Sequence, residues 1–207
     1  MRTHGRSWDA PRRERSRPRA PGRVDTIASC GGSNGIRLAG VSDPRSSRPS
    51  FPDPEEYGPH LEEASAPLNA WGGCSARLEA SELYWLATTR RDGRPHVVPV
   101  GAVWVEDRLW FNTSRQTVIA RTLANEPRAV VHLESAEDIL IVEGLASLLD
   151  LAQVPADVVV AYTDKYGGEW DRGDPDSLWL WFTLDPRSAM SWSFSDMRNT
   201  AIRYDFE

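Results

Sequence analysis

The sequence predicts a mainly β fold with flanking helices: a six- to seven-stranded antiparallel barrel, closed or split. Three observations lead to this class: strand-like apolar runs joined by short loops, a hairpin signal at Asp92-Gly93, and Pro99 within a long strand-like run. Short loops connect antiparallel strands, whereas a doubly wound α/β fold needs a helix between successive parallel strands. The pattern therefore favours a barrel over a doubly wound sheet.

The chain is expected to divide into a mostly disordered tail, residues 1–66, and a folded domain, residues 67–207. The tail is rich in Arg, Pro, Ser and Gly, so it cannot bury enough apolar surface to offset its ordering entropy. Residues 1–50 carry a net charge of +7, and because the whole chain carries −6, residues 51–207 carry −13. Three interpretations stay open: a plain tail, an extension upstream of the true start codon, or an arm for nucleic-acid binding or targeting.

Charge, hydropathy and cysteine content argue against several functions. An acidic domain does not attract nucleic acid, because that binding depends on Lys and Arg releasing counterions. The sequence has no apolar run of about 18 residues, and its first residues lack the apolar core of a secretory signal. Cys30 and Cys74 cannot build a disulfide framework or a CxxC metal site. We therefore expect a cytoplasmic protein without a metal, a membrane span or a nucleic-acid partner.

The predicted elements of the first half alternate between strands and tight turns. A helical segment begins at Cys74, and residues 83–89 (LYWLATT) form a strand. Asp92 and Gly93 supply the positive φ angles of the hairpin turn that leads into a long strand over 95–105. Pro99 has no amide hydrogen, so this position must be an edge, a bulge or a point where the ladder opens. A turn at 106–108 then leads into the strand LWFNT.

The second half begins with a helix over about 115–125, which Pro127 ends. Two strands follow over 128–134 and 138–150, and Gly144 is a predicted bulge or bend in the second. Residues 154–168 predict a helix with a glycine stop. Residues 177–186 and 188–195 predict two late strands, and residues 201–206 alternate as a last one.

The order of these pieces resembles the pyridoxamine 5′-phosphate oxidase-like split barrels. The resemblance covers about residues 76–206 and is carried by WLATTRRDGRPHVVPV, LWFNT, the helix ending in NEP, RAVVHLES, VEG, AYTDKYG and the closing run to IRYDF. It implies a homodimer with each cofactor in a groove between the subunits. The implied cofactor is coenzyme F-420, a deazaflavin, because the Arg-rich composition with one lysine suits a high-GC organism. FMN is the alternative, and haem is the less favoured third.

The resemblance also implies an oxidoreductase that reduces a small organic acceptor, for example at a CH–CH group, by hydride transfer. The cofactor ring does the difficult chemistry, and the protein supplies binding, orientation and exclusion of water. The catalytic residues therefore stay unknown, and the lack of a Ser-His-Asp arrangement does not count against an enzyme. The alternative is a non-catalytic protein that stores or carries a flavin, a deazaflavin or haem. A third hypothesis is a haem-degrading protein of the same barrel class, for which His96 and His132 are the only candidate axial ligands.

The resemblance places the cofactor at two stretches of the chain. One is the strand around the proline, and the other is the corner where a strand gives way to a helix, because helix N-termini bind anions such as phosphate. The implied cofactor-binding residues are Val98, Pro99, Val100, Thr113, Ser114, Arg115, Gln116 and Arg121. The alternative for the corner is that Ser114 only caps the helix. Trp192 and Phe194 are expected on the substrate side of the groove.

One departure from the family pattern concerns the phosphate. The family often places an Arg-Lys pair eight or nine residues before the proline, but this chain has Val118 and Ile119 there. Arg115 and Arg121 are the available substitutes, since Arg binds phosphate bidentately. Otherwise the affinity for phosphate is lost and the cofactor differs.

Overall fold

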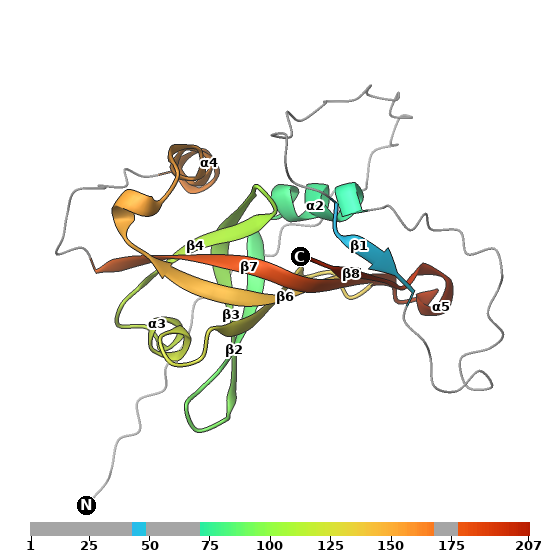
Figure 1. The fold of residues 1–207 in the computed structure, drawn as a ribbon, viewed down its shortest axis with the longest axis horizontal. Coiled ribbons are helices and arrows are strands. Elements are labelled where there is room, and N and C mark those ends of the chain that lie inside the picture. Colours follow the sequence, from blue (N-terminus) through green and yellow to red (C-terminus); the bar gives the residue numbers. More distant parts are fainter. Residues whose placement is uncertain (1–42, 49–70, 168–177) are drawn as a thin grey trace, which may run out of the picture. The chain divides into compact units, whose positions relative to one another are not determined.

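The computed structural model describes residues 43–48, 71–167 and 178–207 (Figure 1). Its strands are β1 (Arg45–Ser47), β2 (Leu83–Thr89), β3 (Pro95–Val105), β4 (Arg108–Ser114), β5 (Arg128–His132), β6 (Asp138–Leu149), β7 (Trp179–Ser193) and β8 (Ile202–Asp205). Its helices are α2 (Trp71–Ala80), α3 (Val118–Leu123), α4 (Ala156–Tyr166) and α5 (Met197–Thr200), with a 3-10 turn at Leu151–Gln153. Apart from residues 43–48, the segment that was predicted to be a tail lies outside the described residues.

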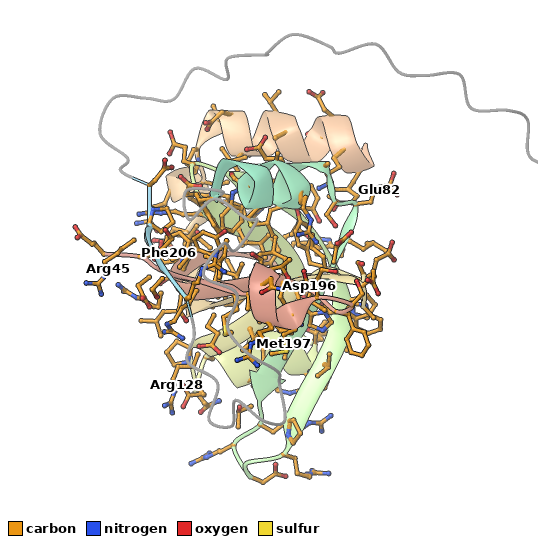
Figure 2. The ribbon with its side chains drawn as sticks, turned by 90° about the vertical axis from the view of Figure 1, so that its right-hand side faces the viewer. Arg45, Glu82, Arg128, Asp196, Met197 and Phe206 are labelled. Carbon is orange, nitrogen blue, oxygen red and sulfur yellow. The ribbon has the colours of Figure 1, made fainter. Side chains whose placement is uncertain are left out.

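The strands build a closed barrel to which two further strands are added. The antiparallel order β7-β4-β3-β2-β5-β6 closes on itself because β6 also pairs with β7. Outside the barrel β8 pairs with β7, and β1 pairs with β8. Figure 2 shows Arg45 of β1 beside Phe206, which follows β8. The predicted antiparallel barrel with flanking helices is confirmed, although neither β1 nor α5 was predicted.

Alternating side chains along the strands fill the barrel. In β2, Tyr84, Leu86 and Thr88 are buried while their neighbours face outward, as a half-buried strand requires. Helix α2 adds Trp71 to this core, with ring centroids 5.1 Å from Tyr204. A second cluster lies outside the barrel, where α4 packs on β3, β4 and β7; it consists of Val103, Trp110, Val154, Val158, Tyr162 and Trp181. In both Figure 1 and Figure 2, α2 and α4 lie on one side of the barrel and the β2–β3 hairpin lies on the other.

Positive φ angles occur in both of the early turns, but in the first turn at only one of the two residues predicted to have them. In the β2–β3 hairpin only Gly93 does so, at φ 84°, while the expected positive φ at Asp92 is wrong. In the β3–β4 turn Glu106 and Asp107 both have φ 54° although neither is glycine. Hydrogen bonding steadies this second turn, because the Trp71 indole donates to Asp107 Oδ1 at 3.1 Å. Asp tolerates this region better than most side chains do, which accounts for Asp107 but not for Glu106.

The two late strands predicted from the sequence are one strand, β7. Its register against β6 shifts at Glu143/Gly144, and Pro186 lies opposite Gly144. Pro186 lacks an amide hydrogen for the ladder. Because it lies at the bulge, where the ladder is already interrupted, the strand continues instead of ending. The predicted bulge at Gly144 is confirmed. A Cβ atom at this position would lie 2.4 Å from the backbone oxygen of Asp185, so glycine is required there.

Candidate functional site

The candidate site lies where β3 and β4 separate. Residues Ala102 to Val105 of β3 pair with β4. The earlier residues of β3 pair with β2, where Pro99 lies opposite Trp85. The ladder therefore opens on the β4 side of Pro99, which confirms one of the three situations predicted for this proline. A groove of about 880 Å³ occupies the opening.

Seven of the eight residues predicted to bind the cofactor line this groove: Val98, Pro99, Val100, Thr113, Ser114, Gln116 and Arg121. Arg115 is absent from the lining, and its amide donates to the carbonyl oxygen of Leu178 at 2.8 Å. Trp192 and Phe194 do not line the groove of their own chain. Trp192 lies opposite Ile139 of β6, and Phe194 is 71 % exposed. Binding by any of these residues stays a prediction, but most of the predicted set is brought together.

The strand-to-helix corner is built differently from either expectation. Strand β4 runs on to Ser114, and α3 begins only at Val118 and has six residues. The helix cap is Thr117, whose Oγ1 accepts a hydrogen bond from the Ala120 amide at 3.2 Å. The alternative that Ser114 is the cap is therefore wrong. The hydroxyls of Thr113 and Thr117 also bond to each other at 3.0 Å, so the polar groups of this corner are largely satisfied within the corner itself.

The structure places both positions of the missing basic pair at the groove. Val118 and Ile119 both line the groove, and Ile119, which is only 6 % exposed, also belongs to the barrel core. A charged side chain at position 119 would be largely buried, which is costly unless an anion in the groove pairs with it. Arg121 is exposed, and its Nη1 donates to the carbonyl oxygen of Gln116 at 2.8 Å. The guanidinium group is thus held close to the start of α3.

Asn112 provides an unused hydrogen-bond donor in the groove. Its side chain is 8 % exposed, and its Nδ2 has no hydrogen-bond partner. Its Oδ1 lies 3.5 Å from the Tyr162 hydroxyl. A buried amide group without a partner costs stability, so such groups are uncommon unless a ligand or water satisfies them. His96 also lines the groove with an unpartnered Nδ1.

One end of the groove is closed by two tyrosines of α4. The Tyr166 hydroxyl accepts from the Ala102 amide at 2.9 Å, and the Lys165 ammonium donates to the Ala102 carbonyl oxygen at 2.9 Å. Burial raises the pKa of Tyr162 to about 12 and also raises the pKa of Tyr166, so both hydroxyls stay protonated at neutral pH. Sequence reasoning missed these tyrosines; their spacing of four residues, which puts both on one face of a helix, was the available signal.

Comparison with known proteins identifies the family. The family model described as pyridoxamine 5′-phosphate oxidase matches residues 73–190, which is more than half of the chain. The chain belongs to the pyridoxamine 5′-phosphate oxidase family. This confirms the resemblance that was drawn from the sequence. No protein with a curated function matches the chain.

Three solved structures are similar to this chain. A conserved hypothetical protein from Mycobacterium tuberculosis is 21 % identical and has a TM-score of 0.50, and the match covers 61 % of this chain and 86 % of that one. An F420 reductase is 21 % identical, with a TM-score of 0.45 and coverage of 56 % and 94 %. The haem storage protein HutZ from Vibrio cholerae is 19 % identical, with a TM-score of 0.46 and coverage of 56 % and 88 %. At 21 % identity the likeness to the first of these shows the fold alone.

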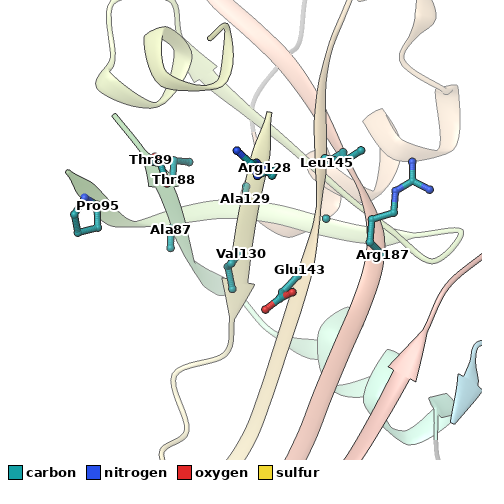
Figure 3. Close-up of a pocket in the computed structure, with 11 residues that line it drawn as sticks. Ala87, Thr88, Thr89, Pro95, Arg128, Ala129, Val130, Glu143, Leu145 and Arg187 are labelled. Atoms are coloured by element: carbon teal, nitrogen blue, oxygen red, sulfur yellow. The ribbon is translucent and has the colours of Figure 1, made fainter. Parts of the chain in front are cut away.

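A second cavity of this family member lies away from the predicted residues (Figure 3). It measures about 530 Å³ and is formed by β2, β5, β6 and the bulge. Arg128, Glu143 and Arg187 are its charged residues, and Arg128 is paired with Glu126 at 2.7 Å. This pairing lowers the pKa of Glu126 to about 2. Because this cavity contains none of the predicted cofactor residues, the groove at β3 and β4 is the better candidate.

Two further searches concern metals and membranes. Within the described residues, no group of three or more His, Cys, Asp and Glu side chains is placed to hold a metal ion. None of the helices in the same residues is long and apolar enough to cross a membrane.

Proposed function

We propose that the protein is an oxidoreductase that binds coenzyme F-420 in the groove, with FMN as the alternative, and reduces a small organic acceptor by hydride transfer. The observation that supports this proposal best is the groove at the open β3–β4 ladder, with apolar walls and the unpaired amide of Asn112. A flat ring that is apolar on its faces and polar at its edge suits such a site. When bound, the cofactor would supply the hydride chemistry.

The residues of the chain would bind and orient the ring and exclude water. Val98 and Pro99 offer apolar contact from β3, and Trp179 offers an aromatic surface from β7. Asn112 would donate its free N–H to a polar atom at the ring edge. Gly101 lets α4 come close, because a Cβ atom there would lie 3.2 Å from the Tyr162 hydroxyl. These contacts fix position rather than transfer protons, so no acid or base is assigned.

We propose that a second copy of the chain completes the site. The outer face of β2 and β3 exposes Leu83, Trp85 and Val97, and apolar patches of this kind mark interfaces. Pro99 lies opposite Trp85 on this face and also lines the groove, so a partner that covers the face would border the groove. Because Phe194 does not line the groove of its own chain, a substrate-side role for it requires the groove of the partner.

His96 supports a second candidate, a haem carrier without catalytic activity. It lines the groove, where a bound haem would need an axial ligand. The other candidate ligand, His132, fits less well, because it does not line the groove and its ring stacks on Trp85. His96 is therefore the residue on which the haem alternative depends.

Cofactor titration tests these proposals. The purified protein would be titrated separately with F-420, FMN and haem, by fluorescence quenching for the first two and by the Soret band for haem. We expect F-420 to bind, and the reduced cofactor to be oxidised when an acceptor with an activated double bond is added. Failure of both flavins to bind below about 100 µM, or about −5.5 kcal/mol, would refute the enzyme proposal.

The haem alternative and the dimer have separate tests. A Soret shift that the wild type shows and His96→Ala loses would favour the haem carrier. His132→Ala is the control and should keep the shift of the wild type. Sedimentation equilibrium would test the dimer. We expect a dimer for the wild type and dissociation for Trp85→Glu, which places a charge on the apolar face.

A further inference from the structure

A third cavity contains a concentration of arginines next to the groove. It measures about 480 Å³ and is lined by Arg90, Arg91, Asp92, Arg94, Val118, Arg121, Thr122 and Asn125. These residues come from the β2–β3 hairpin and from α3, which lie near each other in Figure 1. Val118 and Arg121 line both this cavity and the groove, so the two spaces adjoin. We call the third cavity the arginine pocket.

The arginine pocket is positively charged, whereas the folded domain as a whole is acidic. Four arginines and one aspartate line it, although residues 51–207 as a whole carry a net charge of −13. The residues that line the groove include only one arginine, Arg121. Like charges at close range repel, so an anion that enters the arginine pocket would be attracted to this cluster. The nearby carboxylate, Asp92, already pairs with Arg94 at 2.7 Å.

Arg90 and Arg91 are the arginines available to a ligand. In the described part of the chain neither forms an ion pair, whereas Arg94 is held by Asp92 and Arg121 donates to the Gln116 carbonyl oxygen. The hairpin presents the pair from a fixed turn, because the Gly93 amide donates to the Arg90 carbonyl oxygen at 2.8 Å. Their backbone is therefore ordered while their charges remain unpaired.

The corner at Thr113–Thr117 cannot replace these arginines as an anion site. Thr117 Oγ1 donates to the Ser114 carbonyl oxygen at 2.8 Å and accepts from the Ala120 amide. Ser114 Oγ accepts from the Gln116 amide at 3.3 Å. The Thr117 hydroxyl is thus used for the turn itself, Ser114 keeps a single neutral O–H donor, and α3 is too short to act as a strong dipole. An anion on a ligand of the groove needs partners beyond the corner.

We infer that the arginine pocket binds the phosphate of the groove-bound cofactor, with Arg90 and Arg91 as its main contacts and Arg121 at the shared edge. The cofactor tail would pass Val118, whose small side chain replaces the first cation of the family pair. Arg is suited to this role because its planar group binds phosphate bidentately. The inference rests on the proposed function, since it needs a ring in the groove, and it assigns the phosphate to the hairpin instead of to the helix start.

The test compares ligands that share a ring but differ in the phosphate. FMN would be compared with riboflavin, and F-420 with the deazaflavin chromophore that lacks the phosphate. We expect the wild type to bind the phosphorylated member of a pair at least tenfold more tightly. In Arg90→Ser/Arg91→Ser this preference should fall by about tenfold or more, because charge-assisted hydrogen bonds are lost, while the affinity for the phosphate-free ring stays unchanged. The preference of the wild type should also weaken as salt rises.

A matched control separates local binding from net charge. Arg45→Ser/Arg187→Ser removes the same two charges from exposed positions outside the groove and the arginine pocket and should keep the full preference. Arg91→Ser alone, at the more exposed position, serves if the double variant unfolds at a lower temperature than the wild type. A double variant that keeps the preference would overturn the inference and leave the proposed function intact. If neither ring binds the wild type, the proposed function fails and the inference fails with it.

Discussion

The amide of Asn112 allows a prediction in which stability and binding change in opposite directions. Its Nδ2 is buried without a partner, and an unsatisfied buried donor costs about 1–3 kcal/mol. In Asn112→Leu this cost disappears, and the variant also loses the long contact of 3.5 Å between Oδ1 and the Tyr162 hydroxyl. We expect a net gain of about 1 kcal/mol in the free energy of unfolding of the ligand-free protein, or about 2–4 °C in its melting temperature.

Ligand binding should respond to the same substitution with the opposite sign. If Asn112 donates to the ring edge, its loss removes one hydrogen bond worth about 0.5–1.5 kcal/mol, which weakens binding by about 2- to 10-fold. Thermal unfolding without ligand and fluorescence titration with F-420 or FMN measure the two effects on one preparation. A stabilised variant that binds the cofactor less tightly would support the assigned role.

Thr183 offers a matched control for this experiment. It is buried in β7 with an unpartnered Oγ1, but it does not line the groove. Thr183→Val keeps the shape of the side chain, so it should stabilise the protein and leave the affinity for the cofactor unchanged. The reasoning would be refuted if Asn112→Leu lowered the melting temperature and left the affinity unchanged, because the amide would then serve the fold and not the ligand.

Three further predictions address the barrel, its pH dependence and the groove. Gly144→Ala should lower the free energy of unfolding by about 2 kcal/mol or more in denaturant titration, because the new Cβ would lie 2.4 Å from the Asp185 oxygen. Gly72→Ala is the control: it lies in α2 with no atom within 4 Å, so it should leave stability unchanged or raise it by up to about 1 kcal/mol. Because the pKa of Tyr162 is about 12 in the folded protein against an ordinary 10, its contribution to stability is complete below pH 10 and is lost as pH rises toward 12. Between pH 10 and 12, Tyr162→Phe should therefore lose less stability than the wild type in urea titrations. An equal loss in the two proteins would contradict the raised pKa of Tyr162. Arg121→Ala should weaken phosphorylated cofactor binding by about tenfold with little change in melting temperature, and an unchanged affinity would show that this arginine does not contact the phosphate.

Much of the fold was predictable because local chemistry determines it. A proline without an amide hydrogen marks an opening in a ladder, and this identified the place where β3 and β4 part at Pro99. A glycine inside a strand marks a bulge, and this identified Gly144. Both signals depend on the residue itself and not on its tertiary neighbours, so they can be read without a structure.

The errors arose where tertiary contacts decide between local alternatives. Three hydroxyls lie within five residues at Thr113, Ser114 and Thr117, and any of them fits a helix cap. Only the position where β4 ends selects Thr117. Pro186 suggested a break between two strands, but its place opposite the bulge removes the conflict. The pairing of Asn112 with Tyr162 spans 50 residues and depends on how α4 packs on the barrel, so no local pattern could reveal it.

The strand β1 affects how the protein would behave if it were shortened. Three residues, from Arg45 to Ser47, pair with the outer edge of β8, well before the family match begins at residue 73. A chain that starts at residue 73 and keeps its C-terminal residues would leave the N–H and C=O groups of that edge unpaired. Exposed edges of this kind join with strands of other molecules. The choice of starting residue would therefore decide whether the trimmed protein stays a defined species or associates edge to edge, independently of its cofactor.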